Sequence, residues 1–81
     1  MKVHVRLFAQ MRIEAGTEQL EMELPEEATV SFALEELTKR HPALGRHLGA
    51  CMVAVGLDYV SKSQTLREQD EISLIPPVQG G

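Results

Sequence analysis

Two runs near the start of the chain alternate between apolar and polar side chains. Residues 2–10 place one apolar set on a single face: Val3, Val5, Leu7 and Ala9. Residues 19–24 repeat the alternation, with inward positions at Leu20, Met22 and Leu24. A period of two is typical of a strand with one buried face. The two runs therefore predict an antiparallel hairpin whose loop contains Gly16, and Pro25 ends the second strand because proline has no N–H for the ladder.

The apolar period lengthens to three or four residues after Thr29. The resulting stripe consists of Val30, Ala33, Leu34 and Leu37. Such a stripe is typical of one face of a helix. Thr29 is the predicted N-cap, and His41 ends the helix because the residue before a proline is disfavoured in the α region. A short helical turn is predicted around Leu44 and Leu48.

Two more strands follow the helix. Residues 51–57 alternate again, with predicted inward side chains at Cys51, Val53, Val55 and Leu57. After a short extended segment at Tyr59–Val60 and a polar turn, residues 71–75 form the last strand, with inward side chains at Ile72 and Leu74. A hairpin, a crossover helix and a last strand parallel to the first predict an α+β fold, with a mixed sheet and one main helix on one face. This is the β-grasp, or ubiquitin-like, arrangement, and we assign it to residues 1–75.

The composition predicts one small cytoplasmic domain. The chain has 81 residues, and eight basic against twelve acidic residues give a net charge of −4. Lysines and arginines form no basic stripe of the kind that follows a nucleic-acid backbone. The single cysteine, Cys51, leaves no partner for an intrachain disulfide, and the scattered histidines predict no metal site. We expect neither a membrane span, which needs about 20 apolar residues, nor a signal peptide.

The sequence finishes with Pro-Pro-Val-Gln-Gly-Gly at residues 76–81. Two prolines cannot extend a sheet and favour an extended course, so we expect a flexible tail that projects from the domain. A carboxylate on two glycines has no Cβ beside it, so it can enter a narrow channel and be attacked from either side. A substrate of acyl activation needs this property, whereas a frayed terminus, the usual fate of chain ends, requires neither the prolines nor the glycines.

Over essentially its whole length the chain resembles the small subunits of molybdopterin synthase, which are MoaD-type sulfur carriers of the ubiquitin-like MoaD/ThiS family. The terminal Pro-Pro-Val-x-Gly-Gly is the specific signal. Weaker matches occur at Leu7-Phe8-Ala9, Arg12, Gly16, Thr29-Val30, Ala54-Val55 and Asp70-Glu71-Ile72. Two positions depart from the family pattern, since Gly56 stands where Asn is usual and Gln69 where Gly is common. Both lie in predicted turns and therefore bear on loop geometry rather than on the terminus.

The resemblance implies a sulfur cycle centred on Gly81. An E1-like adenylyltransferase would use ATP to convert the Gly81 carboxylate to an acyl-adenylate, and a persulfide enzyme would donate the sulfur of a terminal thiocarboxylate. The large subunit of molybdopterin synthase would then pass that sulfur to a pterin precursor in molybdenum cofactor biosynthesis. The residues that would enter its active site with Gly81 are Pro76, Pro77, Val78, Gln79 and Gly80. The resemblance also implies a heterotetramer of two small and two large subunits, and this chain is expected to bind no cofactor of its own.

Apolar side chains are predicted to face outward beside the base of the tail. Phe8 interrupts the polar face of the first strand, and Ile75 lies on the outer side of the last strand. If these strands are neighbours, the two side chains meet on an otherwise polar face, a pattern typical of a docking surface. The resemblance adds Tyr59, and Met52 or Ala54 are further candidates. We expect the large subunit to bind here.

The residues form no catalytic constellation of their own. The serines lie outside any Gly-x-Ser-x-Gly motif, and the glycines form no phosphate-binding loop. Cys51 is predicted to be a small core residue rather than a sulfur donor. Three alternatives stay open: a sulfur carrier for thiamine thiazole synthesis or tRNA thiolation, a ubiquitin-like modifier joined through Gly81 to target lysines, and a binding module with an incidental glycine tail.

Overall fold

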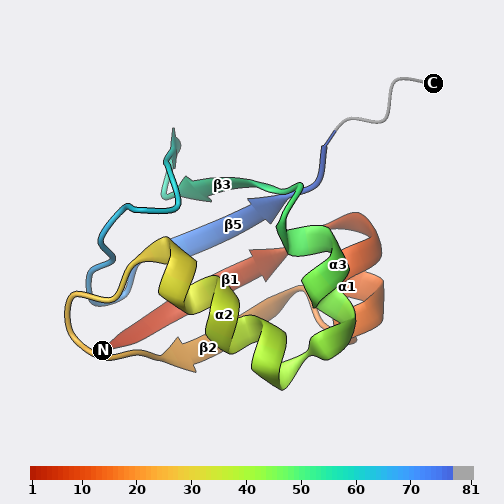
Figure 1. Ribbon diagram of the computed structural model, residues 1–81, viewed down its shortest axis with the longest axis horizontal. Coiled ribbons are helices and arrows are strands. Elements are labelled where there is room, and N and C mark those ends of the chain that lie inside the picture. The colour runs from red at the N-terminus through yellow and green to blue at the C-terminus, as the bar shows by residue number, and fades with distance from the viewer. Residues whose placement is uncertain (78–81) are drawn as a thin grey trace.

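Five strands form one mixed sheet (Figure 1). The computed structural model describes residues 1–77. The strands are β1 (Lys2–Leu7), β2 (Gln19–Glu23), β3 (Met52–Val55), β4 (Asp58–Tyr59) and β5 (Glu71–Ile75), in the spatial order β2-β1-β5-β3-β4. The β1–β5 pair is parallel, and the other three pairs are antiparallel. The predicted pairing of the first and last strands is therefore confirmed.

The main helix, α2 (Val30–Arg40), crosses one face of the sheet, as predicted (Figure 1). The Thr29 hydroxyl oxygen accepts a hydrogen bond from the Phe32 N–H at 3.2 Å, which confirms the N-cap. Three shorter elements lie beside one end of the sheet: α1 (Ala9–Ala15), the 3₁₀ turn η1 (Pro42–Leu44) and α3 (Gly45–Leu48). The face opposite α2 carries the polar side chains of β1 and is called the outer face below.

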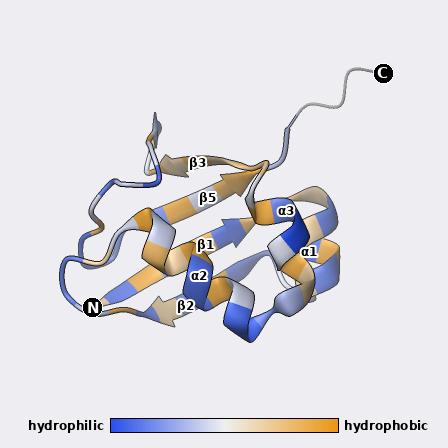
Figure 2. Cartoon of the chain, viewed as in Figure 1, coloured by the Kyte–Doolittle hydropathy of each residue, from blue (hydrophilic) through white to orange (hydrophobic). Residues whose placement is uncertain are grey.

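The core fills the space between α2 and the sheet. Hydrophobic and hydrophilic residues alternate along the central strands, which buries one set of side chains under α2 (Figure 2). The buried set includes Val3, Val5, Leu7, Ile72 and Leu74 from the strands and Val30, Ala33, Leu34 and Leu37 from α2. Leu66, which the sequence placed in a polar turn, is also in the core with 2% of its surface exposed. Its N–H donates to the Ala28 carbonyl at 2.8 Å, so the connection before β5 folds back onto the start of α2.

The first strand is shorter than predicted, because a helix replaces its end and the expected loop. Residues 9–15 form α1, which buries Met11 and leaves Ile13 exposed. Phe8 is extended, whereas Ala9 has a φ of 52°, which breaks the strand. The helix stops at Gly16, whose φ of 77° is readily adopted by glycine and whose N–H bonds to the Arg12 carbonyl.

The third strand also ends earlier than predicted. Val55 pairs with Asp58, so Gly56 and Leu57 form the turn of a tight hairpin rather than a continuing strand. Gly56 has a φ of 61°, and the Leu57 side chain is fully exposed instead of inward. The prediction for Leu57 was wrong because its apolar side chain continues the alternation of Cys51, Val53 and Val55. The apolar pattern alone therefore does not show that the strand ends and a two-residue turn begins at Gly56.

Candidate functional site

The chain leaves the sheet at the end of β5, between two neighbouring strands. Ile75 is the last residue of β5, and Pro76 and Pro77 follow it without regular secondary structure. The predicted tail residues Val78, Gln79, Gly80 and Gly81 lie outside the described residues. Because β5 pairs with β1 on one side and β3 on the other, side chains from all three strands surround the point where the tail begins.

An apolar row crosses the outer face at this point. Met52 pairs directly with Ile75, and Phe8 lies one residue beyond the last pair of β1 and β5. The Arg6 guanidinium lies 5.5 Å from the centre of the Phe8 ring, within the range of a cation–π interaction. Phe8 and Ile75 are half-buried, whereas 52% of Met52 is exposed. The structure thus brings Phe8 and Ile75 together, as the sequence predicted.

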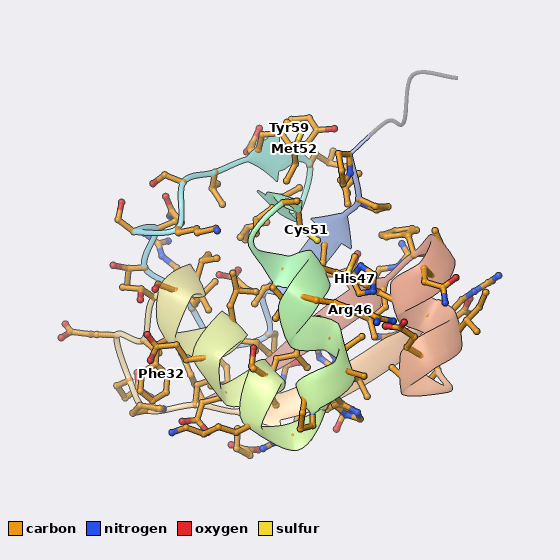
Figure 3. All side chains as sticks on the ribbon, turned by 45° about the vertical axis from the view of Figure 1, so that its right-hand side comes forward. Phe32, Arg46, His47, Cys51, Met52 and Tyr59 are labelled. Atoms are coloured by element: carbon orange, nitrogen blue, oxygen red, sulfur yellow. The ribbon has the colours of Figure 1, made fainter. Side chains whose placement is uncertain are left out.

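Tyr59 extends this row toward the edge of the sheet. It pairs with Ala54, is 64% exposed, and lies beside Met52 near the start of the tail (Figure 3). Ala54 itself is 7% exposed and so adds little surface. Of the two further candidates, Met52 joins the group and Ala54 does not. We call Phe8, Met52, Tyr59 and Ile75 the outer patch.

A hollow of about 370 Å³ lies beside the outer patch, at the base of the tail. Pro76 and Pro77 form one wall, α1 forms a second, and α3 with the residues after it forms the third. Most of the lining is apolar, and it consists of Ala9, Gln10, Met11, Arg46, His47, Ala50, Cys51, Pro76 and Pro77. Nothing in the sequence pattern indicated this hollow, because it depends on the unpredicted helix α1.

Glu14 ties two walls of the hollow together. Its carboxylate accepts hydrogen bonds from Arg46 and, at 2.9 Å, from His47 Nε2, so α1 is held against α3. The Glu14 side chain is 12% exposed, while that of Arg46 is 69% exposed. The Arg46 guanidinium, with a smaller effect of His47, holds the pKa of Glu14 below its ordinary value. Sequence reasoning missed this cluster, since 32 residues separate Glu14 from Arg46.

Cys51 lies in the same wall, but its thiol is buried and unreactive. It is 8% exposed, and its thiol donates to the His47 carbonyl at 3.2 Å. Its sulfur lies 3.5 Å from that of Met11. Burial raises the pKa of the Cys51 thiol, which disfavours the reactive thiolate. The prediction of a core residue is confirmed.

Both departures from the family pattern fall where the backbone is left-handed. Gly56 has a φ of 61° and Gln69 a φ of 68°. Glycine and asparagine tolerate this conformation, so glycine in place of asparagine keeps the first turn intact. Gln69 is stabilised by its surroundings: its N–H donates to the Lys2 carbonyl at 2.7 Å, and its side chain hydrogen-bonds His4 at 2.8 Å. Both turns are therefore compatible with the residues that occupy them.

The chain matches known proteins over nearly its whole length. A family model described as the ThiS family matches residues 5–81. The chain belongs to the ThiS family. It is 32% identical to the molybdopterin synthase sulfur carrier subunit of Chlamydomonas reinhardtii, with 100% of each chain covered. The corresponding subunit of Arabidopsis thaliana is 30% identical, with 100% of this chain and 84% of that protein covered.

Solved structures agree with this assignment. SAMP1 of Haloferax volcanii, a small archaeal modifier protein, superimposes with a TM-score of 0.90 at 29% identity, with 100% of both chains covered. A chain from the protein–protein complex of subunits 1 and 2 of the molybdopterin-converting factor from Helicobacter pylori superimposes with a TM-score of 0.73. The identity is 27%, again with 100% of both chains covered. The β-grasp fold and the resemblance to MoaD-type carriers that the sequence predicted are confirmed.

Groups of metal-ligating side chains and membrane-spanning helices were both sought in residues 1–77 of this ThiS-family chain. In residues 1–77 no three His, Cys, Asp or Glu side chains are grouped to hold a metal ion. No helix in that range is long and apolar enough to cross a membrane. The outer patch, the hollow and the exit of the tail make up the candidate site, because they adjoin one another at the end of β5.

Proposed function

We propose that this protein is the sulfur-carrier subunit of molybdopterin synthase. The observation that carries the proposal is the match to curated sulfur carrier subunits over the whole chain, within a family model that extends through Gly81. The position of the tail supports it, because the chain leaves a central strand between the outer patch and the hollow. A protein that binds this end of the sheet receives the tail at the same time.

The proposed chemistry takes place on the Gly81 carboxylate. One carboxylate oxygen attacks the α-phosphorus of ATP in an E1-like adenylyltransferase, and pyrophosphate leaves. The terminal sulfur of a donor persulfide then attacks the acyl carbon, and AMP leaves. Cleavage of the resulting acyl disulfide by a second thiol releases the thiocarboxylate. Activation is necessary because a free carboxylate is a poor electrophile with no good leaving group, and the adenylate supplies AMP as the leaving group.

The carrier contributes a tether and a docking surface to these steps. The thiocarboxylate is the nucleophile that transfers sulfur to the pterin precursor, while acid and base groups belong to the large subunit. Binding of that subunit to the outer patch holds the tail at its active site. This raises the effective concentration of the thiocarboxylate there. The raised pKa of Cys51 keeps the chain's own thiol from competing as a nucleophile.

Intact mass spectrometry tests the proposal. The protein is produced together with its activating enzyme and sulfur donor, and the expected mass gain equals the difference between a sulfur and an oxygen atom. A variant that lacks Gly81 and one that carries an extra residue after it should show no gain. Loaded protein mixed with the large subunit should convert the pterin precursor to molybdopterin. Sulfur loading of the extended variant would contradict the proposal.

A ubiquitin-like modifier is the second candidate, and the likeness to SAMP1 favours it. That function uses the same activated Gly81 but ends in an isopeptide bond to a lysine of another protein. Denaturing electrophoresis of cell extract distinguishes the two, because a modifier gives a ladder of conjugates that disappears when Gly81 is deleted. A pure sulfur carrier gives a single free band.

A further inference from the structure

Arg6 stands at the border between the charged and the apolar parts of the outer face. β1 presents Lys2, His4 and Arg6 to this face, and Phe8 follows at the next outward position. Lys2 Nζ lies 3.6 Å from a Glu21 carboxylate oxygen, and His4 pairs with Glu21 across the β1–β2 ladder, so both belong to the charged part. Arg6 is therefore the last charged residue of β1 before the outer patch.

The Arg6 guanidinium is held between a carboxylate and an aromatic ring. Its Nη1 lies 3.7 Å from Glu71 Oε1, and its Cζ lies 5.5 Å from the centre of the Phe8 ring. Glu71 begins β5 and pairs with His4, so it reaches Arg6 diagonally across the parallel ladder. Because the ion pair draws the guanidinium toward β5, the long Arg6 side chain is restrained on the sheet rather than free in solvent. Within residues 1–77, Arg6 is the only cation that lies over an aromatic ring.

Phe8 depends on such a contact because it lies between two elements and belongs to neither. It follows β1 and precedes α1, with an extended backbone at φ −131° and ψ 157°. The left-handed φ of 52° at Ala9 fixes the direction of the chain after Phe8 but does not select a side-chain rotamer. The ring has staggered alternatives about χ1, and contacts with neighbouring side chains decide among them. Arg6 covers one face of the ring and leaves the other face to a partner.

We propose that Arg6 is a positioning residue for docking, which holds the Phe8 ring in the orientation that the large subunit of molybdopterin synthase binds. This inference rests on the proposed function, since it concerns the same partner and the same outer patch. A ring that is ordered before binding loses less conformational entropy on binding. When only a fraction of the free chain has the binding-competent orientation, the Kd rises in inverse proportion to that fraction.

The expected effect on affinity is modest, because it is limited by the strength of the contact. An exposed cation–π interaction shifts an equilibrium about two- to fivefold. Arg6→Gln should therefore raise the Kd for the large subunit about two- to fivefold, measured by isothermal titration calorimetry. Arg6→Lys keeps a cation and should recover part of the affinity. Arg67→Gln removes the same charge from an exposed position in the turn before β5 and should leave the Kd unchanged.

A double-mutant cycle distinguishes positioning from direct contact with the partner. If Arg6 acts through the ring, Arg6→Gln should cause no further change in Kd once Phe8→Ala has removed that ring. A two- to fivefold rise that persists in the Phe8→Ala chain shows that Arg6 touches the large subunit itself, and this overturns the inference. An equal rise in Arg67→Gln would assign the effect to net charge and would overturn it as well.

NMR of the free chain measures the orientation of the ring without the partner. Three-bond couplings about χ1 of Phe8 should indicate one dominant rotamer in the unmodified chain and in Arg67→Gln, and averaged rotamers in Arg6→Gln. Unchanged couplings in folded Arg6→Gln overturn the inference and leave the proposed function standing. Failure of the unmodified chain to bind the large subunit, or to take up sulfur on Gly81, would contradict the proposed function instead.

Discussion

Replacing Phe8 with alanine separates docking from folding, because a matched phenylalanine lies on the other side of the molecule. Phe8 belongs to the outer patch, while Phe32 projects from α2 with 36% of its surface exposed (Figure 3). Both rings are partly covered by their own chain. The two alanine variants therefore remove similar groups from opposite faces.

The expected loss of stability for Phe8→Ala is small. Full burial of a phenylalanine contributes about 1.5 to 3 kcal/mol, and Phe8 is only half-buried. The cation–π contact with Arg6 adds about 0.5 to 1 kcal/mol at an exposed site. A total of about 1 to 2 kcal/mol lowers the Tm by roughly 4 to 8 °C per kcal/mol in a domain of this size. The variant should stay folded at room temperature.

The expected effect on binding is larger and specific to Phe8. A central aromatic residue of an interface contributes about 2 kcal/mol or more, which corresponds to a rise in Kd of about 30-fold. Isothermal titration calorimetry with the large subunit measures this, after circular dichroism has shown that both variants are folded. Phe32→Ala should bind like the unmodified chain. An unchanged Kd for folded Phe8→Ala, or an equal loss for Phe32→Ala, would refute the docking role of the outer patch.

Three further predictions concern the walls of the hollow. Gly16→Ala should lower the free energy of unfolding by about 1 to 2 kcal/mol, measured by urea titration, because alanine is strained at a φ of 77°. Glu14 contributes stability above its ordinary pKa of 4.5, and this contribution is lost as the pH falls through its lowered folded pKa. Glu14→Gln should therefore lose less stability than the unmodified chain between neutral pH and pH values below 4.5; an identical pH dependence would contradict the ion pairs. Iodoacetamide should alkylate Cys51 at least about tenfold more slowly in the folded chain than in urea, since the thiol is buried and its pKa is raised. Equal rates would show an accessible thiol.

The sequence predicted those parts of the fold that depend on local period and capping. The alternation of β1 and β5, the stripe of α2 and the cap at Thr29 each have one dominant local cause, and all were confirmed. The helix α1 was missed because its apolar residues Ala9, Met11 and Ile13 continue the period of two from β1. A helix of seven residues is too short to establish a period of its own.

The candidate site divides in the same way. Phe8 and Ile75 were found because each breaks a local pattern, and the parallel pairing of their strands then brings them together. The hollow and its Glu14 cluster were not predictable, since they join α1 and α3 across 32 residues. Their adjacency follows from tertiary packing around Leu44 and Met11, which no local period records.

The central position of β5 has a mechanical consequence for any force that is applied to the tail. Tension applied at Pro77 runs along β5 and loads the ladders with β1 and β3 together. These bonds lie across the direction of pull, so many must yield at once, whereas a strand at the sheet margin would detach along a single ladder. A partner can therefore pull on the tail, or release it, without unfolding the domain. In a force-extension measurement, pulling between Lys2 and Pro77 should give a higher rupture force than pulling between Lys2 and Tyr59, at the marginal strand β4.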